Sequence, residues 1–123
     1  MRDALTAIRN QLDSAGILLS GLCVAHCLLG IALVTLLGIG GGALLSPGIH
    51  EAGLALAIGI GVLTLGLGVL RHGRLAPLAI GACGIALMAA GLAVPHGFGE
   101  AALTVAGVSL VAFAHMRNLR HAC

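Results

Sequence analysis

The sequence predicts an all-α membrane protein with four transmembrane helices in an up-down bundle and both termini in the cytoplasm. Three observations predict this fold class: an apolar composition, four long apolar segments, and the placement of the arginines. Of 123 residues, 59% are hydrophobic and only 8% are charged. Soluble domains usually carry about 25% charged residues, so this chain lacks the polar groups needed to cover a surface in water.

The four apolar segments each approach the length that a membrane requires. They run over about residues 15–39, 49–70, 75–95 and 101–116. A helix of about 20 apolar residues spans a hydrocarbon core. Turn residues separate the segments at Ser46-Pro47-Gly48 and at Pro95-His96-Gly97. We therefore expect a single four-helix membrane domain over residues 1–123, with a short amphipathic lead-in before the first span.

The arginines predict how the helices are oriented. All six basic residues are arginines, and they fall in three pairs: Arg2 and Arg9, Arg71 and Arg74, Arg117 and Arg120. The pairs precede the first segment, separate the second from the third, and follow the fourth. Because basic residues are enriched in cytoplasmic loops, this pattern predicts a multi-pass protein with the N- and C-termini inside. The net charge of +2 follows from this arrangement and does not indicate nucleic-acid binding.

Glycine is abundant, with 20 residues scattered through the apolar segments. Two interpretations stay open. Small residues such as Ala57 and Gly61 either let helices approach closely, within one chain or in a homo-oligomer, or reflect the tolerance of membrane helices for glycine.

The first segment carries the residues with the strongest functional signal, Cys23, His26 and Cys27. Their spacing places all three side chains on one face of a helix. Ionisable residues inside a membrane are costly and are functional candidates by default. Thiols and imidazole together favour Hg(II), Cu(I), Zn(II) or an iron–sulfur centre over magnesium or calcium.

Charge supports a metal ligand role for this face. A divalent ion held by two thiolates is neutral as a unit, whereas a lone thiolate in a medium of low dielectric is costly. Binding is therefore expected to release about two protons and to depend on pH. In the competing interpretation each cysteine is a small apolar filler and His26 is an interhelical hydrogen bonder. We favour the metal face because the three residues share one side of one helix.

Other residues are weaker candidates. Four are candidate secondary metal ligands: Cys83, His115, His121 and Cys123. Cys83 is either a third soft ligand or a filler, and the filler interpretation is favoured. The other three either receive an ion on the cytoplasmic side or are ordinary helix-end and tail residues. At the outward-facing loops, a further set either collects cations or consists of solvated helix ends: His50, Glu51, His96 and Glu100.

Two blocks of the sequence resemble the MerC family of small bacterial membrane proteins. The first block is Asp13-x-x-Gly16-x-x-x-Ser20-x-x-Cys23-x-x-His26-Cys27. The second is Glu100-x-x-Leu103-Thr104-x-x-Gly107, followed by Ala114-His115-x-x-Asn118-x-x-His121-x-Cys123. The blocks lie at opposite ends of the chain, and the hydropathy between them also agrees, so the resemblance covers most of the chain.

The resemblance implies a mercury-resistance type of membrane transporter in the bacterial inner membrane. In that family the first-helix cysteine pair is thought to bind Hg(II) and pass it to cytoplasmic thiols. The mercury-resistance members place this pair as Cys-x-x-Cys and carry several cysteines near the C-terminus, where this chain has Cys123. Here His26 occupies the second position and Cys27 follows it, so the implied pair is Cys23 with either His26 or Cys27.

The predicted function is the binding and inward transport of a soft metal ion by thiol ligand exchange. Mercuric ion is favoured over Zn(II) or Cu(I), with no permanent cofactor. The predicted partners are the lipid bilayer, an outer metal carrier and a cytoplasmic thiol acceptor. The alternative is a non-transporting membrane subunit or sensor that binds copper, zinc or haem through the same face. An enzyme is not expected, because the sequence has no nucleophile–base–acid constellation and no metalloprotease motif.

Overall fold

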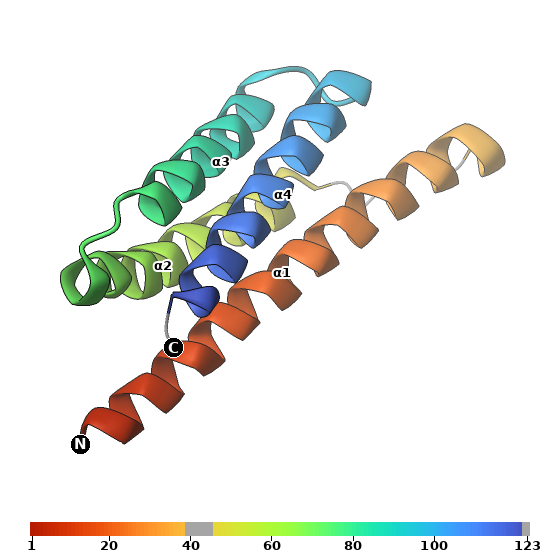
Figure 1. Ribbon diagram of the computed structural model, residues 1–123. Helices are drawn as coiled ribbons and strands as arrows, with labels where there is room; N and C mark the ends of the chain where they lie inside the picture. Colours follow the sequence, from red (N-terminus) through yellow and green to blue (C-terminus); the bar gives the residue numbers. More distant parts are fainter. Residues whose placement is uncertain (39–45, 122–123) are drawn as a thin grey trace.

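The structure, a computed structural model, describes residues 1–38 and 46–121, and these ranges form four α-helices. The helices are α1 (Arg2–Leu37), α2 (Pro47–His72), α3 (Ala76–Ala93) and α4 (Phe98–Arg120). All four are long and apolar enough to cross a membrane, which confirms the predicted class. Consecutive helices run in opposite directions, and α1 lies along the bundle and extends beyond it (Figure 1).

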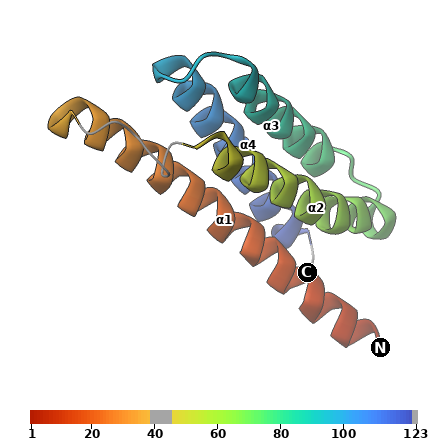
Figure 2. The same cartoon turned by 180° about the vertical axis from the view of Figure 1, so that it is seen from behind.

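The first helix is longer than the apolar segment predicted for it. α1 is continuous over 36 residues, so the expected lead-in belongs to the same helix as the first span. No glycine or proline interrupts its first turns, and the N-terminal part projects away from the other helices (Figure 2). The helix ends at Gly38, whose φ of 62° is the left-handed conformation that glycine adopts at helix C-termini.

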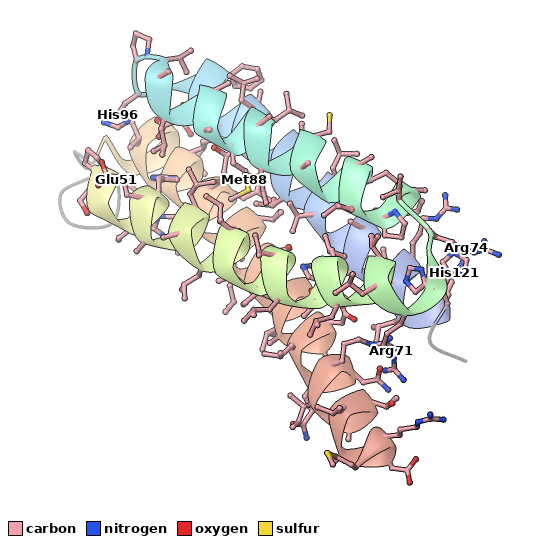
Figure 3. The ribbon with its side chains drawn as sticks, turned by 90° about the vertical axis from the view of Figure 1, so that its left-hand side faces the viewer. Glu51, Arg71, Arg74, Met88, His96 and His121 are labelled. Atoms are coloured by element: carbon pink, nitrogen blue, oxygen red, sulfur yellow. The ribbon has the colours of Figure 1, made fainter. Side chains whose placement is uncertain are left out.

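The charged ends of the helices separate to opposite ends of the bundle. Figure 3 shows Arg71, Arg74 and His121 at one end and Glu51 and His96 at the other. The first end also holds the start of α1 and the end of α4, and these carry the remaining arginines. The alternation of helix direction therefore brings the three arginine pairs of the sequence to one end.

Helices α3 and α4 make the most extensive contact in the bundle. The buried residues of α3 follow one another in steps of four and three: Pro77, Gly81, Gly84, Met88 and Gly91. At the closest approach, a Cβ atom on Gly84 would lie 2.6 Å from the carbonyl oxygen of Gly107, and the reverse is also true. Close helix approach, rather than mere tolerance of glycine, thus explains these two glycines.

We expect Gly84→Ala to destabilise the bundle, because the new methyl group would overlap the backbone of α4. Overpacking of this kind typically costs about 1–3 kcal/mol. The measurement is thermal unfolding of purified protein in detergent. The control is Gly66→Ala in α2, where no atom lies within 4 Å of the added Cβ. Equal unfolding midpoints for the two variants would contradict the proposed contact.

Candidate metal-binding site

The three residues of the predicted metal face lie on the side of α1 that turns toward the bundle. Cys27 is buried at 5% exposure, and Cys23 and His26 are half-buried. Their neighbours Leu22 and Leu28 are more than half exposed, on the side that faces away from the other helices. The structure thus brings the two thiols and the imidazole to the inner face of one helix.

His50 in the first turn of α2 joins this face. Its Nε2 lies 3.8 Å from the Sγ of Cys27, a distance at which thiol and imidazole interact. The ring of His26 meets the ring of His50 edge-on, with centroids 5.6 Å apart. Two helices therefore contribute to one Cys–His cluster, and sequence spacing predicted only the half that α1 supplies.

Glu100 in the first turn of α4 lies next to His50. Its Oε1 is 3.7 Å from His50 Nδ1, and its Oε2 is 2.7 Å from His96 Nδ1. Glu100 is only 7% exposed, so it is not a solvated helix end. Glu51, by contrast, is exposed. From the sequence, each carboxylate was either a collector of cations or a solvated helix end. Burial distinguishes the two residues, because Glu100 is buried and Glu51 is exposed.

Two open grooves border the Cys–His cluster. One, of about 380 Å³, is lined by Cys27, His50, His96 and Glu100 together with apolar side chains from α1 and α4. The other, of about 480 Å³, is lined by Cys23, His26, Cys27 and His50 with Thr104. Cys27 and His50 line both grooves, so the Cys–His cluster is accessible from two sides.

Within residues 1–38 and 46–121, no group of three or more His, Cys, Asp or Glu side chains is arranged to hold a metal ion. The cluster is therefore not a preformed cage of the kind that retains structural zinc. Thiolates are soft ligands, and a mercuric ion is satisfied by two of them. The chemistry of the donor set therefore fits a soft ion bound by few ligands.

The candidate secondary ligands are scattered. Cys83 is exposed on α3, away from the buried face that α3 presents to α4. His115 is fully buried. His121 lies near His72, with ring centroids 5.9 Å apart. Cys123 lies outside the described residues. The structure thus brings neither Cys83 nor His121 to Cys23 and Cys27, whereas His115 and Cys23 line one small cavity of about 10 Å³.

His115 belongs to a buried polar network that sequence reasoning missed. Its Nδ1 lies 2.7 Å from Asp13 Oδ1, and Asn118 Nδ2 donates to Asp13 Oδ2 at 2.8 Å. Thr64 of α2 adds a contact of its Oγ1 with His115 Nδ1 at 3.4 Å. Asp13, Thr64, His115 and Asn118 each have 0% exposure. Three helices are therefore tied together by groups that lipid cannot satisfy.

Gly16 makes room for this network. A Cβ atom at Gly16 would lie 2.5 Å from His115 Nε2, so only glycine lets the imidazole lie against α1. The sequence did contain a signal for this network. Asp13 stands at the start of the first apolar segment, and His115 and Asn118 stand three residues apart near the end of the fourth. Pairing them requires knowing that α1 and α4 are neighbours, and spacing within one helix does not show this.

The end of the bundle that carries the arginines holds a second histidine pair. Loss of hydration together with the positive charges of Arg74 and Arg117 holds the pKa of His121 below its ordinary value of 6.5. A positive charge on His72 adds to this effect. The Nε2 of His72 also lies 3.1 Å from Asn118 Oδ1. The imidazole of His121 is therefore largely neutral at pH 7.

These features define a class of protein: a polytopic helical membrane protein with a thiol–imidazole cluster open to grooves between its helices. Comparison with family models gives the particular family. Residues 13–120 match the model described as MerC mercury resistance protein, so the chain belongs to the MerC family. The match begins at the buried Asp13 and contains the whole Cys–His cluster. No significant match was found among curated proteins or among solved structures.

Removal of the Asp13 carboxylate is expected to destabilise the protein. Asp13→Ala would leave His115 Nδ1 and Asn118 Nδ2 with weaker partners or none, and each unsatisfied buried group costs about 1–3 kcal/mol. The measurement is the thermal unfolding midpoint in detergent. Ser14→Ala is the matched control, because Ser14 is exposed and its hydroxyl donates to the carbonyl of Asn10 within the same helix. Similar midpoints for both variants would show that the network does not stabilise the bundle.

The titration of His121 should have its midpoint below pH 6.5. Because the folded state binds this proton less tightly than the unfolded state does, protonation of His121 lowers stability slightly as the pH falls. The midpoint is measured by NMR of the histidine ring protons in detergent. Arg74→Gln removes one repelling charge and should raise the midpoint. An unchanged midpoint would exclude that arginine as a cause.

Proposed function

We propose that this chain binds mercuric ion at Cys23 and Cys27 and moves it across the bacterial inner membrane. Membership of the MerC family supports a role in mercury resistance. The observation that carries the proposal is the position of Cys27, buried on the inner face of α1 and open to a groove on each side. An ion held there lies between the two ends of the bundle and is shielded from lipid by its ligands.

The proposed chemistry is thiol exchange. For each Hg–S bond that forms, the thiol loses its proton. At the same time the ion loses one bond to the ligand that carried it. His50 Nε2, at 3.8 Å from Cys27 Sγ, is placed to accept that proton. Two thiolates neutralise the divalent ion, which removes the charge that a bilayer would penalise. His26 lies on the same side and supplies a weaker, exchangeable ligand that eases release.

The proposed direction is inward, with the arginine-bearing end of the bundle in the cytoplasm. The clustering of all three arginine pairs at this end supports that orientation, because basic residues are enriched on the cytoplasmic side. An outer metal carrier would deliver the ion at the end that holds His50 and His96. A cytoplasmic thiol would take it from Cys23, which lies one helical turn nearer the arginine-bearing end than Cys27.

The test is uptake of radioactive mercuric ion by cells that express the chain. Cys23→Ser and Cys27→Ser should each reduce uptake at least tenfold, because one thiolate cannot neutralise the ion. Cys83→Ser is the matched control and should retain wild-type uptake, because Cys83 is exposed on α3. Membrane insertion of each variant is checked by immunoblot. Wild-type uptake by both Cys23→Ser and Cys27→Ser would refute the proposal.

The imidazoles beside Cys27 support one alternative. His26 and His50 add nitrogen ligands that suit zinc or copper better than mercury. The alternative is a non-transporting subunit or sensor that binds Zn(II) or Cu(I) through the same face. Binding assays with purified protein, in competition with glutathione, distinguish the two. Retention of Zn(II) or Cu(I) without any uptake of mercuric ion would favour the alternative.

A further inference from the structure

Glu100 is a buried carboxylate with an unusual set of partners. Its Oε2 is hydrogen-bonded to His96, but its Oε1 has no hydrogen-bond partner among the described residues. The facing atom, His50 Nδ1, is likewise buried and unpartnered in that part of the chain. The two atoms are 3.7 Å apart, too far for a hydrogen bond. A buried polar pair of this kind is expensive and calls for an explanation.

Helix capping does not explain Glu100. Glu100 is the third residue of α4, where a carboxylate interacts favourably with the helix dipole. However, the hydrogen bond that its carboxylate makes goes to His96 Nδ1, a side chain outside the helix. The carboxylate turns instead toward two imidazoles and lines the 380 Å³ groove that also contains Cys27. Its orientation therefore fits a ligand that enters the groove better than it fits the helix end.

We propose that His50, His96 and Glu100, which are not arranged around one point in the structure, close on a divalent metal ion that enters the mouth of this groove and so form a loading site. Ligand atoms around one tetrahedral Zn(II) lie roughly 3.3 Å apart, given metal–ligand bonds of about 2.0–2.2 Å. His50 Nδ1 and Glu100 Oε1, at 3.7 Å, lie slightly farther apart than this value, whereas the 2.7 Å between His96 Nδ1 and Glu100 Oε2 is a hydrogen bond that the ion would replace. His96 has a side-chain exposure of 60%, so it is free to turn and complete the site.

His50 connects the loading site to the thiols. Its Nδ1 faces Glu100, while its Nε2 faces Cys27 Sγ. An ion bound at Nδ1 is therefore one side chain away from the thiol face. Nitrogen and oxygen ligands hold a soft ion less strongly than thiolates do, so transfer from the loading site to Cys27 runs toward the tighter ligands. This transfer rests on the proposed function, whereas the existence of the loading site does not.

The experiment uses a cysteine-free full-length chain, with Cys23, Cys27, Cys83 and Cys123 all replaced by serine, purified in detergent without a polyhistidine tag. Co(II) is the probe, because its visible absorption reports the ligand set. We expect one Co(II) per chain, displaced by Zn(II). Glu100→Gln and His50→Gln in this background should each weaken Co(II) binding at least tenfold.

Glu51→Gln is the matched control. Glu51 is adjacent to His50, lies at the same end of the bundle as His96 (Figure 3) and is exposed, so its loss should leave Co(II) binding unchanged. Thermal unfolding checks that each variant keeps the fold. His96→Gln is a third test variant, and because His96 is exposed this change carries little risk of unfolding the protein. It should also weaken binding.

The outcomes separate this inference from the proposed function. Failure of the cysteine-free chain to bind Co(II), or equal binding by the Glu100→Gln and Glu51→Gln variants, would overturn the loading site. Binding of Co(II) as expected would support it. If the cysteine-free chain binds Co(II) while the wild-type chain takes up no mercuric ion, the proposed function fails and the loading site stands.

Discussion

The buried interaction of Asp13 with His115 determines which way α1 faces. Lipid offers no partner for a carboxylate, so Asp13 must turn toward the bundle, where His115 and Asn118 of α4 satisfy both of its oxygens. Cys27 follows Asp13 by 14 residues, which is close to four helical turns. The same rotation of α1 that buries the carboxylate therefore directs Cys27 into the bundle and leaves Leu18 and Leu22 on the outer side.

The close contact of α3 with α4 has a matching effect on the other side of the bundle. Glycines on both helices bring their backbones together at Gly84 and Gly107, and this holds α4 in place along its length. The start of α4 then lies beside the start of α2, where Glu100 meets His50. The polar network and the glycine contact thus act at different depths, and together they align the three helices that supply the Cys–His cluster and its carboxylate.

In the proposed function the Cys–His cluster passes an ion on rather than storing it. Structural metal sites are closed and hold four ligands, whereas here the thiols, imidazoles and carboxylate follow one another along a groove. In the proposed path each step toward Cys27 offers a softer ligand, and His50 lies between Glu100 and Cys27. Within the described residues, the surrounding helices keep the ligands near one another without arranging them around one point.

The sequence by itself determined the number of helices, their membrane character, the pairing of arginines and the Cys23–His26–Cys27 face, because each of these depends on composition or on spacing within one segment. The tertiary structure alone decided which distant residues meet. His50 beside Cys27, Glu100 between two imidazoles and Asp13 against His115 each join different helices. Spacing within a helix specifies which side chains share a face, but not which neighbouring helix that face meets, and the packing of small residues settles this.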